Sequence, residues 1–320
     1  MYEGYITDVE GIKVGHSQTE EGMTGCTVII CEKGATGGVD VRGSAPGTRE
    51  TDLFKAEKMV DKVHGLVLSG GSAFGLDAAS GVMKYLEEND IGFDVGVTKV
   101  PIVASAVIFD LNIGDHRIRP DFQMGYMAAK NANTYDKLQG NIGCGMGATI
   151  GKILGTENSM KSGLGSATVK SGKLIVSALV SVNSFGDIYD FTTNKQIAGV
   201  YDYKNGKLLN TIEIMKSTNK DLGFNIGNTT IGVIATNGIL TKAEGNKIAE
   251  MAHNGFARSI NPIHTMLDGD TIFTMATNEI RADINLLGTL AAEAMSKAIT
   301  NAIMFAEDSG GLKAYKNIFN

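Results

Sequence analysis

The sequence is poor in the residues that mark metal and disulfide proteins. Its three cysteines, Cys26, Cys31 and Cys144, have no metal-ligand spacing, and its five histidines are scattered without a His-x-x-x-His pattern. An odd number of cysteines favours reduced thiols over a disulfide framework. We therefore expect neither a metal nor another cofactor, and we expect a reducing compartment.

Clusters of positive charge and long apolar runs are also missing. The 320 residues have a net charge of −6, and no lysine or arginine cluster is longer than a few residues. This argues against nucleic acid or an anionic membrane as the main partner. No apolar stretch reaches the ~18 residues that a membrane span needs, and the first residues lack a basic segment followed by an apolar run. These absences predict a cytoplasmic protein.

Apolar runs indicate a large, strand-rich core. Hydrophobic residues make up 43% of the chain, enough for one large domain or two ordinary ones. Glycine accounts for 41 residues, well above the usual share of about 7%, which predicts tight turns and close backbone approaches. Continuous apolar runs predict strands, several buried on both faces, over Cys26–Cys31, Val63–Ser69, Ala104–Phe109, Leu174–Val182, Thr229–Ala235 and Thr271–Ala276.

Helical periodicity separates some of these runs. It predicts helices over Ser72–Asn89, Thr241–Ala257 and Ala282–Ala306, and Thr241 with Glu244 forms a capping box. The polar stretch Tyr189–Phe224 offers only a hairpin at Val200–Leu209. Its later part, residues 210–225, is expected to be an exposed, poorly ordered loop.

The junction Asn228-Thr229 carries the most chemistry. A polar, glycine-containing stretch ends there and a β-type run begins. If the chain is cut between the two residues, Thr229 becomes an N-terminus with a hydroxyl and a free amine. A free α-amine titrates near ~8, so it can act as general base for its own hydroxyl. The alternative is ordinary turn chemistry before a strand, since Asn and Thr hydrogen-bond locally.

A second candidate nucleophile is Ser72, in the strand–turn–helix segment Leu68–Gly75. The segment is similar to a nucleophile elbow, but Phe74 replaces the final glycine of Gly-x-Ser-x-Gly. Asp187 and either His253 or His264 are the possible triad partners. The favoured alternative is a tight glycine turn in which Ser72 caps the helix.

Three further segments supply polar groups. The glycines of 143–148 fit neither a dinucleotide fingerprint nor a P-loop and are expected to shape a loop at a helix start, from which Lys152 can enter a site. Asp268 and Asp270 flank Gly269 and face one side in extended chain, so their carboxylates repel unless a cation lies between them. Asn183 ends an apolar run, and its amide can donate to an oxyanion. The structural alternatives are an exposed lysine at 152, a simple Asp-Gly turn before the strand at 268–270, and an asparagine that only ends a strand at 183.

Long strings of the sequence together resemble the self-cleaving L-aminopeptidase/D-esterase family, which includes β-peptidyl aminopeptidases and nylon-oligomer hydrolases. The resemblance covers nearly the whole chain and is far more specific than any single motif. The strings, in order, are ITDVEGIKVGH (6–16), GVDVRGSAPGTRETD (38–52), LSGGSAFGLDAA (68–79), GATIGK (147–152), NTT (228–230) and HTMLDGDT (264–271).

The resemblance implies an α+β fold, a four-layer αββα sandwich of the N-terminal-nucleophile type. It implies one domain, 1–320, that cuts itself into a long chain, 1–228, and a short chain, 229–320, and assembles as a homo-oligomer, a tetramer of processed heterodimers. By motif match Thr229 is the nucleophile and Lys152 and Asn183 are its partners, with Asn183 in the oxyanion hole. Asp268 and Asp270 orient and charge-balance the Thr229 amine.

The same resemblance implies an amide-bond hydrolase that acts on a small peptide or an amino-acid amide or ester. The Asp-Gly-Asp segment and the threonine place the chain nearer the nylon-oligomer hydrolase branch than the members with an N-terminal serine. An acyltransferase with the same nucleophile and a non-enzymatic oligomeric binding protein are the alternatives. An aminopeptidase needs an acidic anchor for the substrate ammonium, for which the candidates are Asp40, Glu50, Asp52, Asp110 and Asp115.

Overall fold

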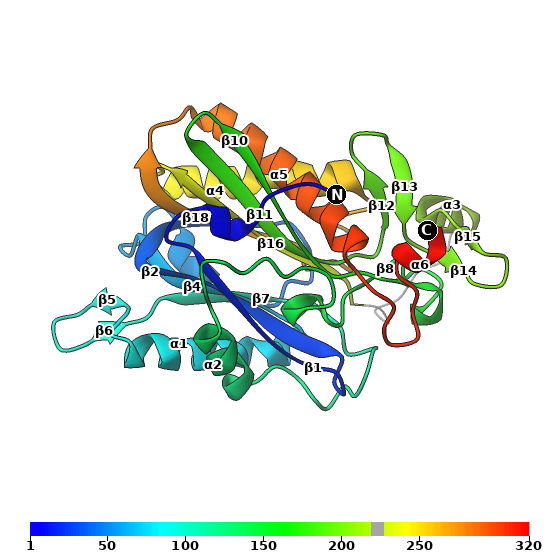
Figure 1. The fold of residues 1–320 in the computed structure, drawn as a ribbon, viewed down its shortest axis with the longest axis horizontal. Coiled ribbons are helices and arrows are strands. Elements are labelled where there is room, and N and C mark those ends of the chain that lie inside the picture. Colours follow the sequence, from blue (N-terminus) through cyan, green and yellow to red (C-terminus); the bar gives the residue numbers. More distant parts are fainter. Residues whose placement is uncertain (219–226, 320) are drawn as a thin grey trace.

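Four layers stack in the order helices, sheet, sheet, helices (Figure 1). The computed structural model describes residues 1–218 and 227–319. Helices α4 (Lys242–Ser259) and α5 (Ile284–Met304) cover one outer face, and α1 (Ala78–Glu88) and α2 (Phe122–Lys130) cover the other. The αββα sandwich implied by the sequence resemblance is therefore confirmed.

A single hydrogen-bonded path forms both inner layers. Its strand order is β10-β11-β16-β18-β2-β4-β7-β3, with β1 beside β2. The long strand β2 joins the layers, because its later half pairs with β18 and its earlier half pairs with β1 and β4, with a register shift between Ile30 and Ala35. The bounds are β1 Lys13–Thr19, β2 Thr24–Val41, β3 Thr48–Arg49, β4 Lys62–Ser69, β7 Val103–Val107, β10 Leu164–Ser171, β11 Leu174–Asn183, β16 Thr229–Gly238 and β18 Thr271–Ile280.

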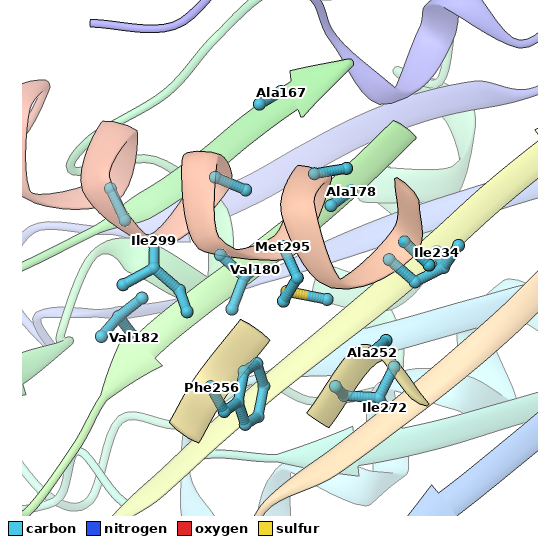
Figure 2. Close-up of a cluster of buried hydrophobic side chains, with 14 of the residues drawn as sticks. Ala167, Ala178, Val180, Val182, Ile234, Ala252, Phe256, Ile272, Met295 and Ile299 are labelled. Atoms are coloured by element: carbon cyan, nitrogen blue, oxygen red, sulfur yellow. The ribbon is translucent and has the colours of Figure 1, made fainter. Parts of the chain in front are cut away.

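Each pair of adjacent layers encloses its own apolar core. Between α4, α5 and the sheet, side chains such as Phe256, Met295 and Ile299 pack on Val180 and Ile234 (Figure 2). A second cluster fills the space between the sheets, and a third lies under α1 and α2. Strands buried on both faces explain why the apolar runs are continuous instead of alternating.

Most of the expected elements are confirmed, with shifts at their ends. All six strands are present, although the one expected to reach Phe109 ends at Val107. Helix α4 begins with the capping box of Thr241 and Glu244. The helix expected from Ser72 begins as a 3₁₀ turn, η3 (Ser72–Asp77), because Gly71 and Ser72 both have positive φ, 80° and 53°. Ser72 provides no side-chain cap, so that expectation was wrong.

The polar stretch after residue 187 is more regular than expected. Strands β12 (Asp187–Asp190), β13 (Lys195–Ala198) and β17 (Ile260–Asn261) form a small sheet, and the predicted hairpin is confirmed as β14 (Tyr201–Asp202) and β15 (Lys207–Leu208). Helix α3 (Thr211–Thr218) replaces the first part of the expected loop, and residues 219–225 of that loop lie outside the described residues. The Asn210 side chain caps α3 and the Asp187 carboxylate anchors its start, a distant contact that no local pattern shows.

Short elements complete the description. They are η1 Ile6–Asp8, η2 Thr51–Phe54, β5 Phe93–Asp94, β6 Lys99–Val100, η4 Gly143–Gly145, β8 Thr149–Ile150, η5 Thr156–Asn158, β9 Met160–Lys161 and α6 Lys316–Phe319. Among the helices of residues 1–218 and 227–319, none is both long and apolar enough to cross a bilayer.

Candidate active site

Thr229 begins the central strand β16 and is almost fully buried, at 5% exposed. Asn183, the last residue of β11, lies directly opposite it in the antiparallel ladder. On the other side, Asn228 forms a parallel bridge with Asp268, just ahead of β18. The sheet register therefore gathers the end of one strand and the starts of two others at one point.

Two donors converge on the carbonyl oxygen of Asn228. The Thr229 hydroxyl donates to it at 2.5 Å, and the Gly269 backbone N–H donates at 3.0 Å. The Asn228 N–H itself donates to the Leu267 carbonyl at 3.2 Å. The carbonyl of the peptide bond before Thr229 is thus fixed by two donors and polarised beside a hydroxyl.

The Asp268-Gly269-Asp270 segment is held tightly against this bond. Backbone N–H groups of Arg42 and Gly43 donate to the Asp270 carbonyl, and that of Ala45 donates to the Asp268 carbonyl. A Cβ on Gly269 would lie 2.8 Å from the Thr229 hydroxyl oxygen and 2.7 Å from the Ala45 carbonyl oxygen. Only glycine permits this approach.

The two aspartates are both buried but have different partners. Asp270 accepts from the Thr230 N–H at 2.7 Å through Oδ1 and from His264 through Oδ2. Asp268 accepts from the N–H and the hydroxyl of Thr265, each at 2.7 Å, through Oδ2. Its Oδ1 is buried and makes no hydrogen bond within the described residues. Burial and the neighbouring Asp270 charge raise the pKa of Asp268.

Lys152 is buried at the site, so the interpretation of it as an exposed lysine is wrong. Its ammonium donates to the Asn183 side-chain oxygen at 2.7 Å and to the Asn183 carbonyl at 3.2 Å. Burial lowers the pKa of Lys152 from 10.5 to about 7, although the nearby charges of Asp268 and Asp110 oppose the shift. The lysine that the motif placed near the site therefore loses its proton more readily than a surface lysine.

Asn183 is held by three groups. Besides Lys152, the Thr149 N–H donates to its Oδ1 at 3.1 Å. Its amide Nδ2 donates to the Phe109 carbonyl at 2.9 Å. An amide has two hydrogens on that nitrogen, so one remains for another acceptor. Asn183 is therefore oriented firmly enough to present a single donor direction.

A cavity of about 390 Å³ opens in front of Thr229. Its described lining is largely apolar and contains no charged side chain: Ala45, Pro46, Gly47, Ser72, Ala73, Val107, Ile108, Phe109, Gly227, Asn228, Thr229 and Leu267. The five acids considered as ammonium anchors are not among these residues. Asp110, for example, is buried and accepts from the Thr24 hydroxyl and the Gly71 N–H, each at 2.7 Å.

The alternative serine triad is not assembled within the described residues. Ser72 lines the cavity, but the proposed partners are engaged elsewhere. Asp187 accepts from Thr211, His253 faces the Asp40 carbonyl at 3.1 Å, and His264 faces Asp270 at 2.9 Å. The elbow resemblance of residues 68–75 therefore reflects a tight turn that shapes the cavity wall.

Sequence reasoning missed a second buried lysine, Lys161. It donates to the carbonyls of Gly145 and Ala148, both at 3.0 Å, and to that of Ser162. Burial lowers its pKa to about 7. It thereby clamps the glycine-rich segment, a short 3₁₀ turn (η4) where a helix start was expected, just ahead of Lys152. No spacing in the sequence distinguishes this lysine from a surface one.

The described residues contain no group of three or more His, Cys, Asp or Glu side chains that can hold a metal ion. The chemistry available here is that of a hydroxyl, an amide, an ammonium and two carboxylates around one polarised peptide bond.

Comparison with known proteins relates the chain to peptidases. The sequence pattern of Peptidase family S58 matches residues 4–316. An uncharacterized aminopeptidase of Mycobacterium tuberculosis (strain H37Rv) is 37% identical over 345 residues, covering 98% of this chain and 97% of that protein. The 6-aminohexanoate-oligomer endohydrolase of Kocuria sp. (strain KY2) is 32% identical over 311 residues, covering 92% of this chain and 84% of that protein.

Solved structures show the same fold. The L-aminopeptidase D-Ala-esterase/amidase of Ochrobactrum anthropi, described as a variant of the Ntn hydrolase fold, superposes with a TM-score of 0.74 at 17% identity. The β-aminopeptidase of Burkholderia sp. superposes with a TM-score of 0.69 at 20% identity. Each match covers 98% of this chain and 92% of the other.

Proposed function

Since the chain belongs to Peptidase family S58, we propose that it is an amide-bond hydrolase whose nucleophile is Thr229, released as an N-terminus by cleavage of its own Asn228–Thr229 bond. The observation that carries the proposal is the pair of hydrogen bonds on the Asn228 carbonyl, from the Thr229 hydroxyl and the Gly269 N–H. The first places a nucleophile beside an amide carbonyl. The second places a donor where negative charge develops on attack.

Self-cleavage uses these groups directly. The Thr229 oxygen attacks the Asn228 carbonyl carbon, and its proton passes to the Thr229 nitrogen as the C–N bond breaks. The product is an ester between Asn228 and the Thr229 side chain. Water then hydrolyses the ester and leaves a carboxylate on Asn228 and a free amine on Thr229. The Gly269 N–H donates to the carbonyl oxygen throughout.

Turnover repeats the chemistry on a substrate. The Thr229 amine takes the hydroxyl proton, the oxygen forms an acyl-enzyme, and the proton passes to the leaving amine before water releases the acid. The unpaired Oδ1 of Asp268 suits the ammonium form of that amine. The remaining amide hydrogen of Asn183 suits the oxyanion, and one such donor is worth about 3–4 kcal/mol in comparable enzymes. Lys152 holds Asn183 in that orientation.

The cavity supports a small substrate with an uncharged acyl group. Its described walls are largely apolar, so an aliphatic acyl chain fits them better than one with a charge near the scissile carbonyl. The 6-aminohexanoate-oligomer endohydrolases among the relatives carry a name consistent with such a chain. A small peptide or an amino-acid amide or ester meets the same requirement.

The decisive experiment is intact-mass measurement and N-terminal sequencing of the purified protein. We expect two fragments, 1–228 and 229–320, the smaller beginning Thr-Thr-Ile-Gly-Val. Thr229→Ala should stay uncut and inactive, while Thr229→Ser, which keeps a hydroxyl, should still be cut. If the Thr229→Ala chain is cut normally, the proposal is wrong.

Assembly and location belong to the same proposal. On the resemblance to self-cleaving relatives, the two fragments stay together as one domain, and the processed heterodimers form a cytoplasmic homo-oligomer, a tetramer. Sedimentation of the processed protein tests this, since a mass of a single 33.8 kDa unit contradicts it.

A further inference from the structure

His264 lies beside the site but has no part in the chemistry above. We propose that it is a positioning residue for Thr229, acting through Asp270. The inference rests on the proposed function, because it concerns the same nucleophile. It gives a role to a side chain that the sequence offered only as a partner for Ser72.

Asp270 connects His264 to the start of β16. The His264 Nδ1 lies 2.9 Å from Asp270 Oδ2, and the His264 backbone N–H donates to the same oxygen at 3.2 Å. The other oxygen, Oδ1, accepts from the Thr230 N–H at 2.7 Å. Since Thr230 is bonded to Thr229, the orientation of this one carboxylate sets where the new N-terminus points.

The contact also separates the roles of the two aspartates. Two buried carboxylates this close disfavour each other's ionised form. A hydrogen bond from the His264 ring to Oδ2, with the Thr230 N–H on Oδ1, keeps both oxygens of Asp270 occupied. Asp268 is left with a buried, unpartnered Oδ1 in the described structure, ready for the amine. With the imidazole in place, Asp270 binds the Thr230 backbone N–H, and Asp268 remains available to the Thr229 amine.

The fold holds His264 in a conformation that few side chains adopt. Its φ is +58°, in the left-handed region. Its ring packs edge-on against the His253 ring, with centroids 4.8 Å apart, and lies tilted to the Phe256 ring, with centroids 6.2 Å apart. Burial lowers the pKa of His253, so that ring stays neutral and does not compete for the Asp270 charge. The titratable groups in contact with His264 are Asp270 and His253, and His253 in turn contacts Asp40.

Two substitutions that tolerate positive φ test the role. In His264→Asn the amide can still donate to Asp270, whereas His264→Gly keeps only the backbone N–H. We expect His264→Gly to slow self-cleavage and to lower kcat by about 10–100-fold, with KM within about twofold, because the nucleophile is misaimed while the cavity is intact. His264→Asn should recover most of both rates. The control His116→Asn, at an exposed histidine away from these contacts, should process and turn over normally.

The outcomes separate this inference from the proposed function. If Thr229→Ala stays uncut but His264→Gly matches the wild type, the role of His264 is disproved and the nucleophile stands. If His264→Asn is as slow as His264→Gly, the ring hydrogen bond is not what matters, and the inference is again wrong. Circular dichroism and Tm verify folding. If His264→Gly does not fold, the processing and turnover rates of His264→Asn and His264→Asp are compared instead. The two side chains are similar in shape, but only asparagine has an amide donor, so His264→Asn should be the faster variant.

Discussion

Thr229 lies between two regions of opposite character. In front is the cavity, whose described walls are largely apolar and carry no charged side chain. Behind and beside Thr229 is a buried polar cluster of Lys152, Asn183, Asp268 and Asp270, in which most polar atoms have a fixed partner. In the proposed mechanism, the cavity selects the acyl group and the cluster orients Thr229.

The two regions should tolerate change to different degrees. An apolar wall adapts to substitution at modest cost, since no hydrogen bond is lost. In the cluster, removing one partner leaves another buried group unsatisfied, at about 1–3 kcal/mol each and more for charged groups. Substitutions in each region test whether this division is correct.

The largest effect is expected from Asp268→Asn in the cluster. The substitution keeps the shape but removes the carboxylate that balances the Thr229 ammonium in the proposed mechanism, so kcat should fall by at least about 100-fold, the scale of a lost acid–base group. Asp270→Asn should slow processing and turnover less, because its oxygen still accepts from Thr230. Mass spectrometry follows processing, and an amino-acid anilide reports turnover. Unchanged rates in both variants remove the aspartates from the mechanism.

The two buried lysines provide a matched pair within the cluster. Lys152→Met should abolish most activity while the protein stays folded, because Asn183 loses the donor that orients it. Lys161→Met should mainly lower Tm, because carbonyls of Gly145, Ala148 and Ser162 lose their donor. Equal losses of activity in both variants, with unchanged Tm, would contradict this assignment.

The burial of Lys152 also predicts a pH dependence of stability. The pKa of Lys152 is about 7 in the folded protein and 10.5 when exposed, so between these values the unfolded chain binds more protons. This lysine therefore destabilises the fold fully below pH 7, and the cost disappears as pH rises toward 10.5. When an uncut variant is unfolded with urea, its unfolding free energy should rise between pH 7 and pH 9. The rise should be smaller once Lys152→Met is added to that variant.

A smaller effect is expected when charge is placed in the cavity. Ala73→Asp should lower hydrolysis of an N-acetylated aliphatic anilide about tenfold, roughly the 1–2 kcal/mol of one unfavourable pocket contact. The same substitution should raise the rate for an anilide with a free ammonium relative to the rate for the N-acetylated anilide. The uncharged control Ala73→Asn separates charge from size. Equal effects of both substitutions would show that the apolar character of this wall does not select the substrate.

The smallest effect is expected far from both regions, at the start of α4. Thr241→Ala removes the side chain that accepts from the Glu244 N–H, which should cost about 1 kcal/mol of unfolding free energy. Processing and kcat should not change. A large loss of activity would mean that α4 is coupled to the site more closely than its position suggests.

Several features of the molecule were available from local sequence. Continuous apolar runs marked the buried strands, and the Thr241 capping box marked the start of α4. The Asn228-Thr229 junction stood out because a polar segment meets a β-type run there. These predictions succeed because strand burial and helix capping depend on residues near each other in the chain.

Other features were decided by contacts between distant segments. Lys152 and Lys161 are both lysines in polar, glycine-containing surroundings, yet one orients Asn183 and the other clamps a turn. Helix α3 was expected to be a loop because its anchor, Asp187, lies 24 residues away from Thr211. Ser72 resembled a catalytic serine, but no histidine of the described structure reaches it.

By itself, the sequence determined the strands, the principal helices and the position of Thr229 at a strand start, since these follow from periodicity and local hydrogen bonding. Only the tertiary structure decided that the Asn228 carbonyl receives both the Thr229 hydroxyl and the Gly269 N–H, and that His264 contacts Asp270. The register between β11, β16 and β18 brings these groups together, and register depends on packing across layers, which no local pattern encodes.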